Sequence, residues 1–469
     1  MHRVSYSDSD VVRVVSERFV PIRVDPDRRP DIGERYTLTG WPTTAFLTPT
    51  GVLLGGGGHL DPGRLLAVLS QVLEAFATGG YESPPHDGPP DRDHADADRG
   101  DGSTLSAPLS PETEAPGLWL DDQLRSQFDQ AWAGFGRGAK RAHAAALKAA
   151  VLRIRRLGPE GLDDIVTRTL DAIADGGLLD GVEGGFFRYC EGPGWSRPQV
   201  EKILAVNARL IDLLLTASSV LKQPRYAERA AETIRFVHDR LAEPDGGFFA
   251  SQRADPDYSA LTTLEARERH GEPPVDRSVY VDTTATMASA YVLGASVLDD
   301  DSLLEFAATA VDRVVMETYE RGGGVGHTLS GRPRVRGLLS DHVAASAALL
   351  DLYEASGQAV YLDMPQELMA YCQQEMWDEG AGFRDRIRGA SNEPPPIGLL
   401  REPYRPFALN CRAALVLGRL GTLTEQDHYS ADALRVLASQ TSVCQARGLD
   451  GADYVLALEQ LRALSDAGA

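Results

Sequence analysis

Apolar residues recur at helical spacing over most of the chain beyond residue 118. A glycine-rich turn followed by an aromatic or apolar residue returns between pairs of these segments, at Gly134-Phe135, Gly184–Phe186, Gly246–Phe248, Gly322–Val325 and Gly380–Phe383. Repetition of this kind is typical of stacked helical hairpins. Six hairpins either close into an α/α toroid or continue as an open solenoid, and the irregular spacing leaves both open. The predicted helices lie around 119–133, 141–156, 160–174, 198–221, 225–241, 280–298, 302–319, 338–355, 362–376, 405–420, 430–440 and 452–464.

The first 80 residues have a different pattern, in which helical segments alternate with short β-type segments. Helices are predicted over 9–17, after Pro30 and after Asp61, where Pro62 is typical of a first helical turn. Strands are predicted over the ranges 19–24, 44–47 and 52–54. This alternation indicates a small α/β domain over residues 1–80.

Residues 81–117 separate these two parts of the chain. They contain seven prolines, nine acidic residues and two basic residues, with few apolar side chains. Such a segment cannot bury enough apolar surface to offset the entropy lost on ordering. We therefore expect a disordered acidic linker over 81–117 and a helical domain over 118–469.

Charge and cysteine content narrow the possible partners. The 469 residues include 68 acidic and 47 basic ones, so the net charge is −21, which disfavours nucleic acids and anionic membranes. No run of about 18 apolar residues predicts a membrane span. Cys190, Cys372, Cys411 and Cys444 are dispersed, as in a reducing compartment, without the spacing of a disulfide framework or zinc site. We expect an acidic cytoplasmic protein with no metal and no other cofactor.

Several motifs occur in the same order as in a known family. Gly40-Trp41-Pro42-Thr43 enters a predicted strand, and Gly184–Tyr189, Trp195, Pro198–Leu204 and Asn207 form a longer motif. The chain resembles the thioredoxin-domain protein family related to spermatogenesis-associated protein 20. In that family a DUF255-type thioredoxin-like domain precedes an (α/α)6 toroid like those of N-acylglucosamine 2-epimerases and six-hairpin glycosidases. The resemblance implies a cis-proline at Trp41-Pro42 beside a redox site.

The chain departs from this family at the redox site itself. Members typically carry a Cys-His-Trp-Cys-like motif shortly before the segment that matches Ser5–Asp8, and this chain begins after it. By the same resemblance the chain lacks the first strand of the thioredoxin fold. We expect an N-terminally incomplete domain, either in a shortened chain or in one that has lost its cysteines, and no thiol oxidoreductase activity.

The resemblance implies that the site lies at one mouth of the toroid, where inner helices begin. Sugar chemistry there requires carboxylates or histidines for proton transfer. Glu201, Asp282, Asp341 and His342 are the candidates for catalysis. Glu201 has a structural alternative, in which it stabilises the first turn of its own helix and pairs with Arg188. Asp282 could instead be a helix N-cap, and Ser340 is a plausible N-cap next to Asp341. His342 could be a buried structural histidine.

Other side chains are candidates for binding the substrate. Lys202 suits a phosphate or carboxylate group, while Asn207 and Asn410 lie on apolar helices, where a satisfied core amide is the alternative. His327 follows a glycine run and is more often structural in such a place. The full set of predicted binding residues is Arg188, Tyr189, Trp195, Lys202, Asn207 and Asn410.

Two functions from different classes follow. The resemblance implies carbohydrate metabolism in the toroid cavity, with epimerase-like or glycosidase-like chemistry on a sugar or sugar phosphate. The missing cysteines favour the alternative, a non-catalytic protein whose thioredoxin-like domain binds a protein partner. The sequence alone leaves open whether the chain is an enzyme.

Overall fold

The computed structural model describes residues 4–38, 40, 42–79, 110–159, 161–329, 335–389 and 396–468. The chain divides into two compact units. The first combines Met1–Asp101 with Arg384–Pro406, and the second combines Gly102–Phe383 with Phe407–Ala469. The grouping of Arg384–Pro406 with the N-terminal unit is not indicated by the helical repeat. Most of the predicted linker over 81–117 lies outside the described residues.

The first unit contains a two-stranded antiparallel sheet and a core between two helices. Strand β1 (Thr44–Leu47) pairs with β2 (Leu53–Gly57), and helices α1 (Ser9–Arg18) and α3 (Pro62–Thr78) pack together. Helix α3 begins as predicted, with Asp61 accepting a hydrogen bond from the Arg64 N–H. A shorter helix, α2 (Pro30–Tyr36), completes the predicted helices. The core of the unit consists of Val11, Phe46, Leu65 and Leu69.

The prediction of a strand over 19–24 is wrong. A strand requires a neighbour for its backbone hydrogen bonds, and within the described residues the sheet contains β1 and β2 alone. Pro21 also removes one N–H donor from the segment. The side chains of Val20 and Ile22 are 86% and 78% exposed, so they contribute little to the core of this unit.

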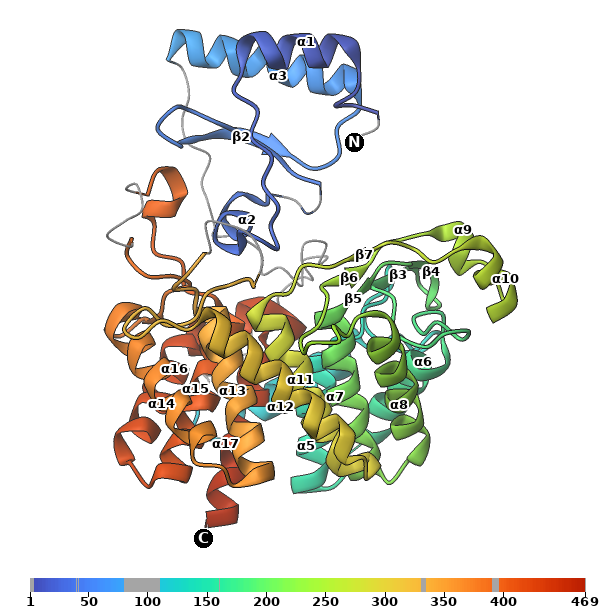
Figure 1. The fold of residues 1–469 in the computed structure, drawn as a ribbon, viewed down its shortest axis with the longest axis vertical. Coiled ribbons are helices and arrows are strands. Elements are labelled where there is room, and N and C mark those ends of the chain that lie inside the picture. The colour runs from blue at the N-terminus through green and yellow to red at the C-terminus, as the bar shows by residue number, and fades with distance from the viewer. Residues whose placement is uncertain are drawn as a thin grey trace. The chain divides into compact units, whose positions relative to one another are not determined.

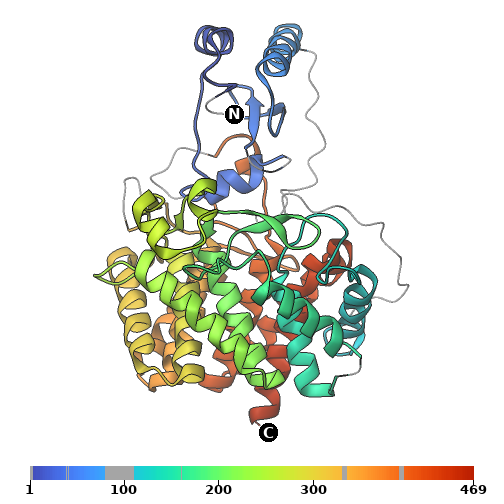
Figure 2. The same ribbon diagram turned by 90° about the vertical axis from the view of Figure 1, so that its right-hand side faces the viewer.

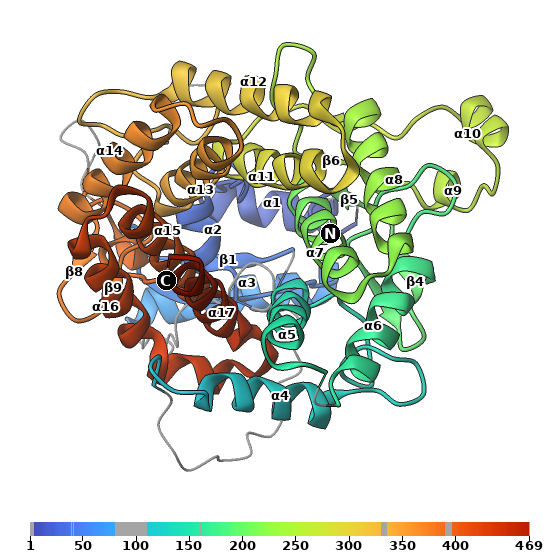
Figure 3. The ribbon, with the colours of Figure 1, turned by 90° about the horizontal axis from the view of Figure 1, so that it is seen from below.

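The second unit is a closed ring of helical hairpins (Figure 3). Six helices, α5, α7, α11, α13, α15 and α17, contact one another in that order, and α17 returns to α5. The other long helices cover the outside of this inner ring, as Figures 1 and 2 show from two sides. The predicted (α/α)6 toroid is therefore confirmed, and the open solenoid is excluded. The twelve long helices of the described residues are α4 (Ala115–Gln127), α5 (Ala144–Leu157), α6 (Asp163–Asp175), α7 (Leu204–Leu221), α8 (Pro224–Arg240), α11 (Val281–Leu298), α12 (Asp301–Thr318), α13 (Leu339–Ser356), α14 (Val360–Glu375), α15 (Phe407–Thr424), α16 (Asp427–Cys444) and α17 (Ala452–Gly468).

Short strands lie at the end of the ring where the inner helices begin (Figure 1). They form three small antiparallel sheets, and a loop with two short helices, α9 (Pro256–Ser259) and α10 (Leu264–His270), connects β6 to β7. Helix α7 starts at Leu204 rather than near 198, because the preceding residues pair in these sheets. The strands are β3 (Tyr189–Gly192) with β4 (Ser196–Gln199), β5 (Lys202–Ile203) with β6 (Ser251–Gln252) and β7 (Val275–Asp276), and β8 (Trp377–Asp378) with β9 (Gly382–Phe383).

Helix α7 is the one helix, among the described residues, that is long and apolar enough to cross a membrane. Its 18 residues have a mean hydropathy of 1.5, and half of them are buried. Because α7 contacts α5, α8 and α11, burial inside the ring accounts for its apolar composition. Its length and hydropathy are thus those of a core helix.

Candidate functional site

The mouth of the ring is built from one repeated turn that leads from an outer helix to an inner helix. In four such turns an acidic residue donates its backbone N–H to the carbonyl of a glycine four or five residues later. Each glycine has a positive φ, which disfavours any other residue. The recurring glycines of the sequence therefore mark the places where the chain enters the inner ring. The pairs are Asp129 with Gly134, Asp180 with Gly185, Glu243 with Gly247, and Glu320 with Gly324.

Each of these acidic side chains is paired with a cation: Asp129 with Lys140, Asp180 with Lys202, Glu243 with Arg313, and Glu320 with Arg336. Lys202 Nζ lies 2.7 Å from Asp180 Oδ2 and donates to the Gly184 carbonyl at 2.8 Å. Burial lowers the pKa of Lys202, although the charge of Asp180 opposes this effect. The ammonium predicted to bind substrate is thus placed inside a turn and holds it closed.

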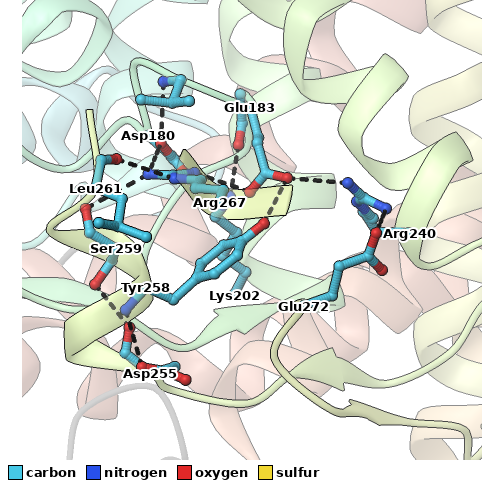
Figure 4. A network of polar contacts seen from close by, with 12 residues as sticks. Asp180, Glu183, Lys202, Arg240, Asp255, Tyr258, Ser259, Leu261, Arg267 and Glu272 are labelled. Carbon is cyan, nitrogen blue, oxygen red and sulfur yellow. Dashed lines mark hydrogen bonds and ion pairs between the residues drawn. The ribbon is translucent and has the colours of Figure 1, made fainter. Parts of the chain in front are cut away.

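Arg267 extends this ion pair into a buried network (Figure 4). Its guanidinium bonds both oxygens of Asp180, at 2.6 and 2.9 Å, and one oxygen of Glu183 at 2.8 Å. Tyr258 donates its hydroxyl to the other oxygen of Glu183 at 2.8 Å. Burial alone would raise the pKa of Asp180, but the bonds from Arg267 and Lys202 outweigh it and lower the pKa. The network fixes α9 and α10 over the turn, a structural role.

The fourth residue of an inner helix clamps the turn that precedes it. Asn207 accepts the Phe186 N–H at 2.7 Å and donates to the Phe186 carbonyl at 3.1 Å. Asn410 makes the same two bonds with Phe383, at 2.7 and 2.9 Å. In α11 this position is Thr284, whose buried hydroxyl has no hydrogen-bond partner in the part of the chain that the structure describes. Both asparagines are therefore satisfied core amides, which is the structural alternative to substrate binding.

His342 occupies the same fourth position in α13. Its Nε2 accepts the Val325 N–H at 3.2 Å, so the ring proton lies on Nδ1, which donates to the Leu338 carbonyl at 2.7 Å. Burial lowers the pKa of His342 to about 4. Because the backbone engages both ring nitrogens, His342 clamps the turn and has no ring nitrogen left for proton transfer to a substrate.

Glu201 does not lie in the first turn of a helix, and that prediction is wrong, because α7 begins three residues later at Leu204. Its Oε2 is 3.7 Å from Arg188 Nη1, and both side chains are about one-third exposed. The Arg188 guanidinium also lies over the ring of Tyr189, 6.0 Å from its centroid. These three residues form a partly exposed group at the mouth, separate from the turn clamps.

The remaining predicted residues lie elsewhere. Trp195 is buried, packs against Gly134, and its indole N–H has no hydrogen-bond partner within the described residues. Trp41 lies outside the described residues, while Pro42 is described and exposed. The cis-proline expected there stays a prediction.

Asp282, His327 and Asp341 meet where α11 and α13 begin. Asp282 is the second residue of α11, Asp341 is the third residue of α13, and His327 lies in the loop before α13. The Val281 N–H donates to the His327 carbonyl at 3.0 Å, which fixes this loop against the start of α11. One potential ligand atom from each of the three side chains lies within 4.8 Å of the other two.

The helix-cap roles considered for Asp282 and for Ser340, the neighbour of Asp341, do not apply. The N-cap of α11 is Tyr280 and that of α13 is Leu338. The Asp282 carboxylate accepts the N–H of the next residue, Thr283, at 2.7 Å. Both helices nevertheless direct their N-terminal ends at the cluster, where the helix dipole favours negative charge.

Burial divides the cluster into an inner pair and an outer carboxylate. His327 Nδ1 lies 2.9 and 3.1 Å from the two oxygens of Asp341, and both side chains are at most 1% exposed. The ring of Tyr280 stacks on His327 at 5.0 Å. Burial raises the pKa of Asp341 to about 6 in spite of His327, and the charge of Asp282 adds to the rise. Asp282 is partly exposed, so it is the member of the cluster that solvent reaches.

The cluster is suited to proton transfer. A buried carboxylate orients the imidazole, and a second carboxylate offers its oxygens to a ligand at the mouth. Two carboxylates and one imidazole are also a donor set that divalent metals accept, although no metal was predicted from the sequence. Asp282 and Asp341 were predicted as catalytic candidates. The sequence favours a structural role for His327, although its position in the loop that leads into α13 is a local signal of a place at the mouth.

Comparison with known proteins agrees with the family resemblance. Residues 1–79 match the family model Thioredox_DsbH, described as a protein of unknown function, DUF255. Human spermatogenesis-associated protein 20 is 22% identical over 509 residues, which cover 82% of this chain and 64% of that protein. The uncharacterized protein B0495.5 of Caenorhabditis elegans is 25% identical over 296 residues, which cover 56% of this chain and 38% of that protein. The chain thus spans 38% and 64% of the lengths of these two relatives.

Solved structures with a similar fold act on sugars according to their names. Cellobiose 2-epimerase from Spirochaeta thermophila has a TM-score of 0.56 and 15% identity, covering 76% of this chain and 100% of that chain. A sugar epimerase from a ruminal bacterium has a TM-score of 0.55 and 12% identity, and the match covers 68% of this chain and 84% of that chain. The GH76 α-mannanase BT2949 of Bacteroides thetaiotaomicron has a TM-score of 0.53 and 10% identity, and the match covers 75% of this chain and 96% of that chain. At these identities the likeness establishes the toroid fold alone.

Proposed function

We propose that the helical ring binds a carbohydrate at the mouth where α11 and α13 begin and transfers a proton to and from it there. The neighbours in fold, which include sugar epimerases, a mannose isomerase and glycoside hydrolases, support the carbohydrate as substrate class. Because one fold hosts many functions, the observation that carries the proposal is the Asp282–His327–Asp341 cluster. It combines an accessible carboxylate with a buried imidazole–carboxylate pair.

The three residues have different roles in this proposal. Asp282 exchanges the proton with the sugar, because it is the partly exposed member of the cluster. His327 and Asp341 are positioning residues, since a substrate does not reach side chains that are at most 1% exposed. Their hydrogen bond fixes the imidazole, and the imidazole in turn sets the electrostatic environment of Asp282.

Burial also favours one reaction class over another. A glycoside hydrolase requires two carboxyl groups that both reach the glycosidic bond. Asp341 is 0% exposed, so it does not flank a sugar together with Asp282. Removal of the proton next to the carbonyl of an open-chain aldose needs one accessible base. Return of the proton to C1 of the enediolate gives a ketose, and return to the opposite face of C2, after the enediolate has turned over, gives the epimer. We therefore place the activity among epimerisations and aldose–ketose isomerisations.

The test incubates the protein with cellobiose and D-mannose, the sugars in the names of the neighbours, and with other aldoses, and separates the products by chromatography. We expect an epimer or ketose to form. Asp282→Asn should lower its rate at least about 100-fold, the usual contribution of a general base. Glu201→Gln is the matched control, since Glu201 is a carboxylate of the mouth outside the cluster. Absence of product from every aldose, without thermal stabilisation by any, would refute the proposal.

A further inference from the structure

Two inner helices of the ring each present a single row of partly exposed residues. Within residues 207–217 of α7 the partly exposed ones are Arg209, Asp212 and Thr216, and the others are buried. Within residues 284–291 of α11 they are Thr286 and Ser289. Because residues three or four positions apart lie on the same side of a helix, solvent reaches one face of each helix.

This face is directed toward the lumen, the space that the six inner helices surround (Figure 3). Helix α7 contacts α5 and α11 within the inner ring and α8 in the outer layer, and α11 correspondingly contacts α7, α13 and α12. These neighbours account for the buried faces of both helices. Asp282 continues the row of α11, since positions 282, 286 and 289 have the same spacing and Asp282 is partly exposed. The carboxylate of the proposed proton transfer therefore faces the lumen.

An ion pair between α5 and α7 lies deeper in the lumen than Asp282. Lys148 Nζ donates to both carboxylate oxygens of Asp212, at 2.7 and 2.6 Å, and the two side chains are 16% and 33% exposed. Lys148 is the fifth residue of α5 and Asp212 is the ninth of α7, whereas Asp282 is the second of α11. At about 1.5 Å per residue, the pair lies about 6 to 12 Å from the ends of the helices at the mouth. Since the Cα–Cβ bonds tilt toward the N-terminus of a helix, both side chains project back toward the mouth.

This pair differs from the lysine pairs that close the turns of the mouth. Lys140 and Lys202 are at most 2% exposed, and each also donates to a backbone carbonyl of its turn. Lys148 and Asp212 make the two bonds to each other and no further hydrogen bond within the described residues. An ammonium has three N–H donors, and a carboxylate has about four acceptor positions. One donor and several acceptor positions of the pair are therefore open to the lumen.

We infer that Lys148 and Asp212 together bind two neighbouring hydroxyl groups of the carbohydrate and hold it in the lumen below Asp282. This inference rests on the function proposed above. The ammonium donates its remaining N–H to the oxygen of one hydroxyl, and the carboxylate accepts a hydrogen bond from the other hydroxyl. Sugars carry such hydroxyls on adjacent carbons. Because α7 contacts both α5 and α11, the pair and Asp282 lie on neighbouring walls of the lumen.

A binding role and a purely structural role predict different results. Partly exposed ion pairs contribute little to the stability of a fold. Removal of the pair should therefore weaken sugar binding strongly and change thermal unfolding only slightly. Hydrogen bonds from charged groups to a ligand are stronger than those between neutral groups, so their loss is measurable as a change in affinity.

The experiment is titration calorimetry of the full chain that carries Asp282→Asn, so that a bound sugar does not react. D-mannose and cellobiose are the ligands. We expect this parent to bind at least one of them saturably. Addition of Lys148→Met or Asp212→Leu should weaken the binding about tenfold, and Lys148→Arg, which keeps the charge and the donors, should recover part of it. The double variant Lys148→Met with Asp212→Leu leaves no single charge without its partner, and it serves where a single variant does not fold.

The matched control is a second ion pair between neighbouring inner helices. Arg419 Nη2 of α15 lies 2.8 Å from Asp351 Oδ1 of α13, and both side chains are partly or largely buried. Asp351 is the thirteenth residue of α13, so it lies about 18 Å from the end of that helix at the mouth. Asp351→Asn should bind the sugar as the parent does.

Monodeoxy analogues of the bound sugar provide a readout that a structural role would not change. For at least one analogue the parent should lose affinity about tenfold, because one bond to the pair is missing. In the Lys148→Met or the Asp212→Leu variant this loss should disappear, since the removed hydroxyl and the removed side chain are partners in the same bond.

Several results would overturn the inference. One is sugar binding of equal affinity in the parent and in the folded double variant, and another is equal weakening in Asp351→Asn. A third is a loss from every monodeoxy analogue that is the same with and without the pair. The absence of any sugar binding by the parent would overturn it as well. Sugar binding that depends on the pair, without proton exchange by the chain that retains Asp282, would refute the proposed proton transfer alone and leave the binding site in place.

Discussion

His327 Nδ1 lies between the two carboxylate oxygens of Asp341, at 2.9 and 3.1 Å, and this pair is buried where the inner helix α13 begins. Ionising a carboxylate in such a buried place costs free energy, and a neighbouring imidazole offsets only part of this cost. The partly exposed Asp282 completes the cluster on the side of the mouth. Buried titratable groups with a shifted pKa, next to an accessible carboxylate, are more frequent at functional sites than in ordinary packing.

Asp341→Asn is expected to change how stability depends on pH. Burial raises the pKa of Asp341 from 3.8 to about 6, so its contribution to stability is fully present below about pH 4 and is lost as the pH rises through about 6. The rise corresponds to about 3 kcal/mol. In urea unfolding, the free energy of unfolding of the variant should rise by about 3 kcal/mol relative to that of wild type between about pH 4 and pH 7.

The control for this measurement is Asp122→Asn, at a carboxylate on α4 whose side chain is 58% exposed. The free energies of unfolding of Asp341→Asn and wild type could instead depend on pH in the same way from acid to neutral pH. That result would contradict a raised pKa for Asp341.

His342→Asn is expected to preserve the fold, because Asn207 and Asn410 occupy the same position in α7 and α15. The amide oxygen would accept the Val325 N–H in place of Nε2. We expect a change in unfolding free energy within about 1 kcal/mol at neutral pH, whereas His342→Ala should cost about 2 kcal/mol because it leaves that buried N–H without an acceptor.

The pH dependence of the same variant gives a second readout. Burial lowers the pKa of His342 from 6.5 to about 4, so wild type loses stability as the pH falls through this interval. The asparagine variant lacks this loss, so its free energy of unfolding should rise relative to that of wild type as the pH falls. For Asp341→Asn, the relative free energy of unfolding should instead rise as the pH increases. A variant that loses stability steadily toward low pH compared with wild type contradicts the clamp role.

Arg267→Met tests whether the network in Figure 4 holds the α9–α10 loop in place. Removal of the guanidinium leaves Asp180 and Glu183 buried with fewer partners. Breaking a buried pair in this way typically costs about 3–5 kcal/mol. Arg269→Ala, at an exposed arginine of the same helix, should cost less than about 0.5 kcal/mol. Chemical denaturation of the two variants checks the difference, and equal stabilities would exclude the network as a structural element.

The thiols of the chain are expected to be unreactive in the folded state. Cys190, Cys372, Cys411 and Cys444 are buried, and none of these four described residues forms a disulfide. Burial raises the pKa of Cys190 to about 11 and that of Cys444 to about 12. A disulfide exchange reaction requires an accessible thiolate. A colorimetric thiol reagent should therefore label none of them under native conditions and all four in denaturant. Rapid labelling of a native thiol, or reduction of insulin by the protein, would contradict this expectation.

The ring could be predicted because its signal is local and repeated. A glycine with a positive φ, such as Gly185 or Gly324, recurs in the turns that lead into inner helices. The apolar period of each helix likewise needs no long-range information. The strand expected over 19–24 failed because a strand exists only with a partner, which a local pattern does not reveal.

The contacts that define the sites join residues far apart in the sequence, and a local pattern does not predict such contacts. His327 and Asp341 lie fourteen positions apart, and Asp282 comes from another hairpin. Arg35 contacts Asp385 across 350 positions, so the grouping of Arg384–Pro406 with the N-terminal unit carried no sequence signal. Conversely, Lys202 and Asn207 suggested ligand binding by residue type, but backbone and side chains of the turns occupy their polar atoms.

The most direct test of the central claim is the rate at which an aldose exchanges its C2 proton for deuterium in D2O, followed by proton NMR. Because Asp282 is partly exposed, a proton held on its carboxylate is expected to exchange with solvent before it returns to the sugar, even when no net product accumulates. The wild type and Glu201→Gln should catalyse the exchange for at least one aldose, and Asp282→Asn should be slower by at least about 100-fold. Equal exchange rates in wild type and Asp282→Asn, or no exchange above the rate without protein, would contradict proton transfer at this mouth.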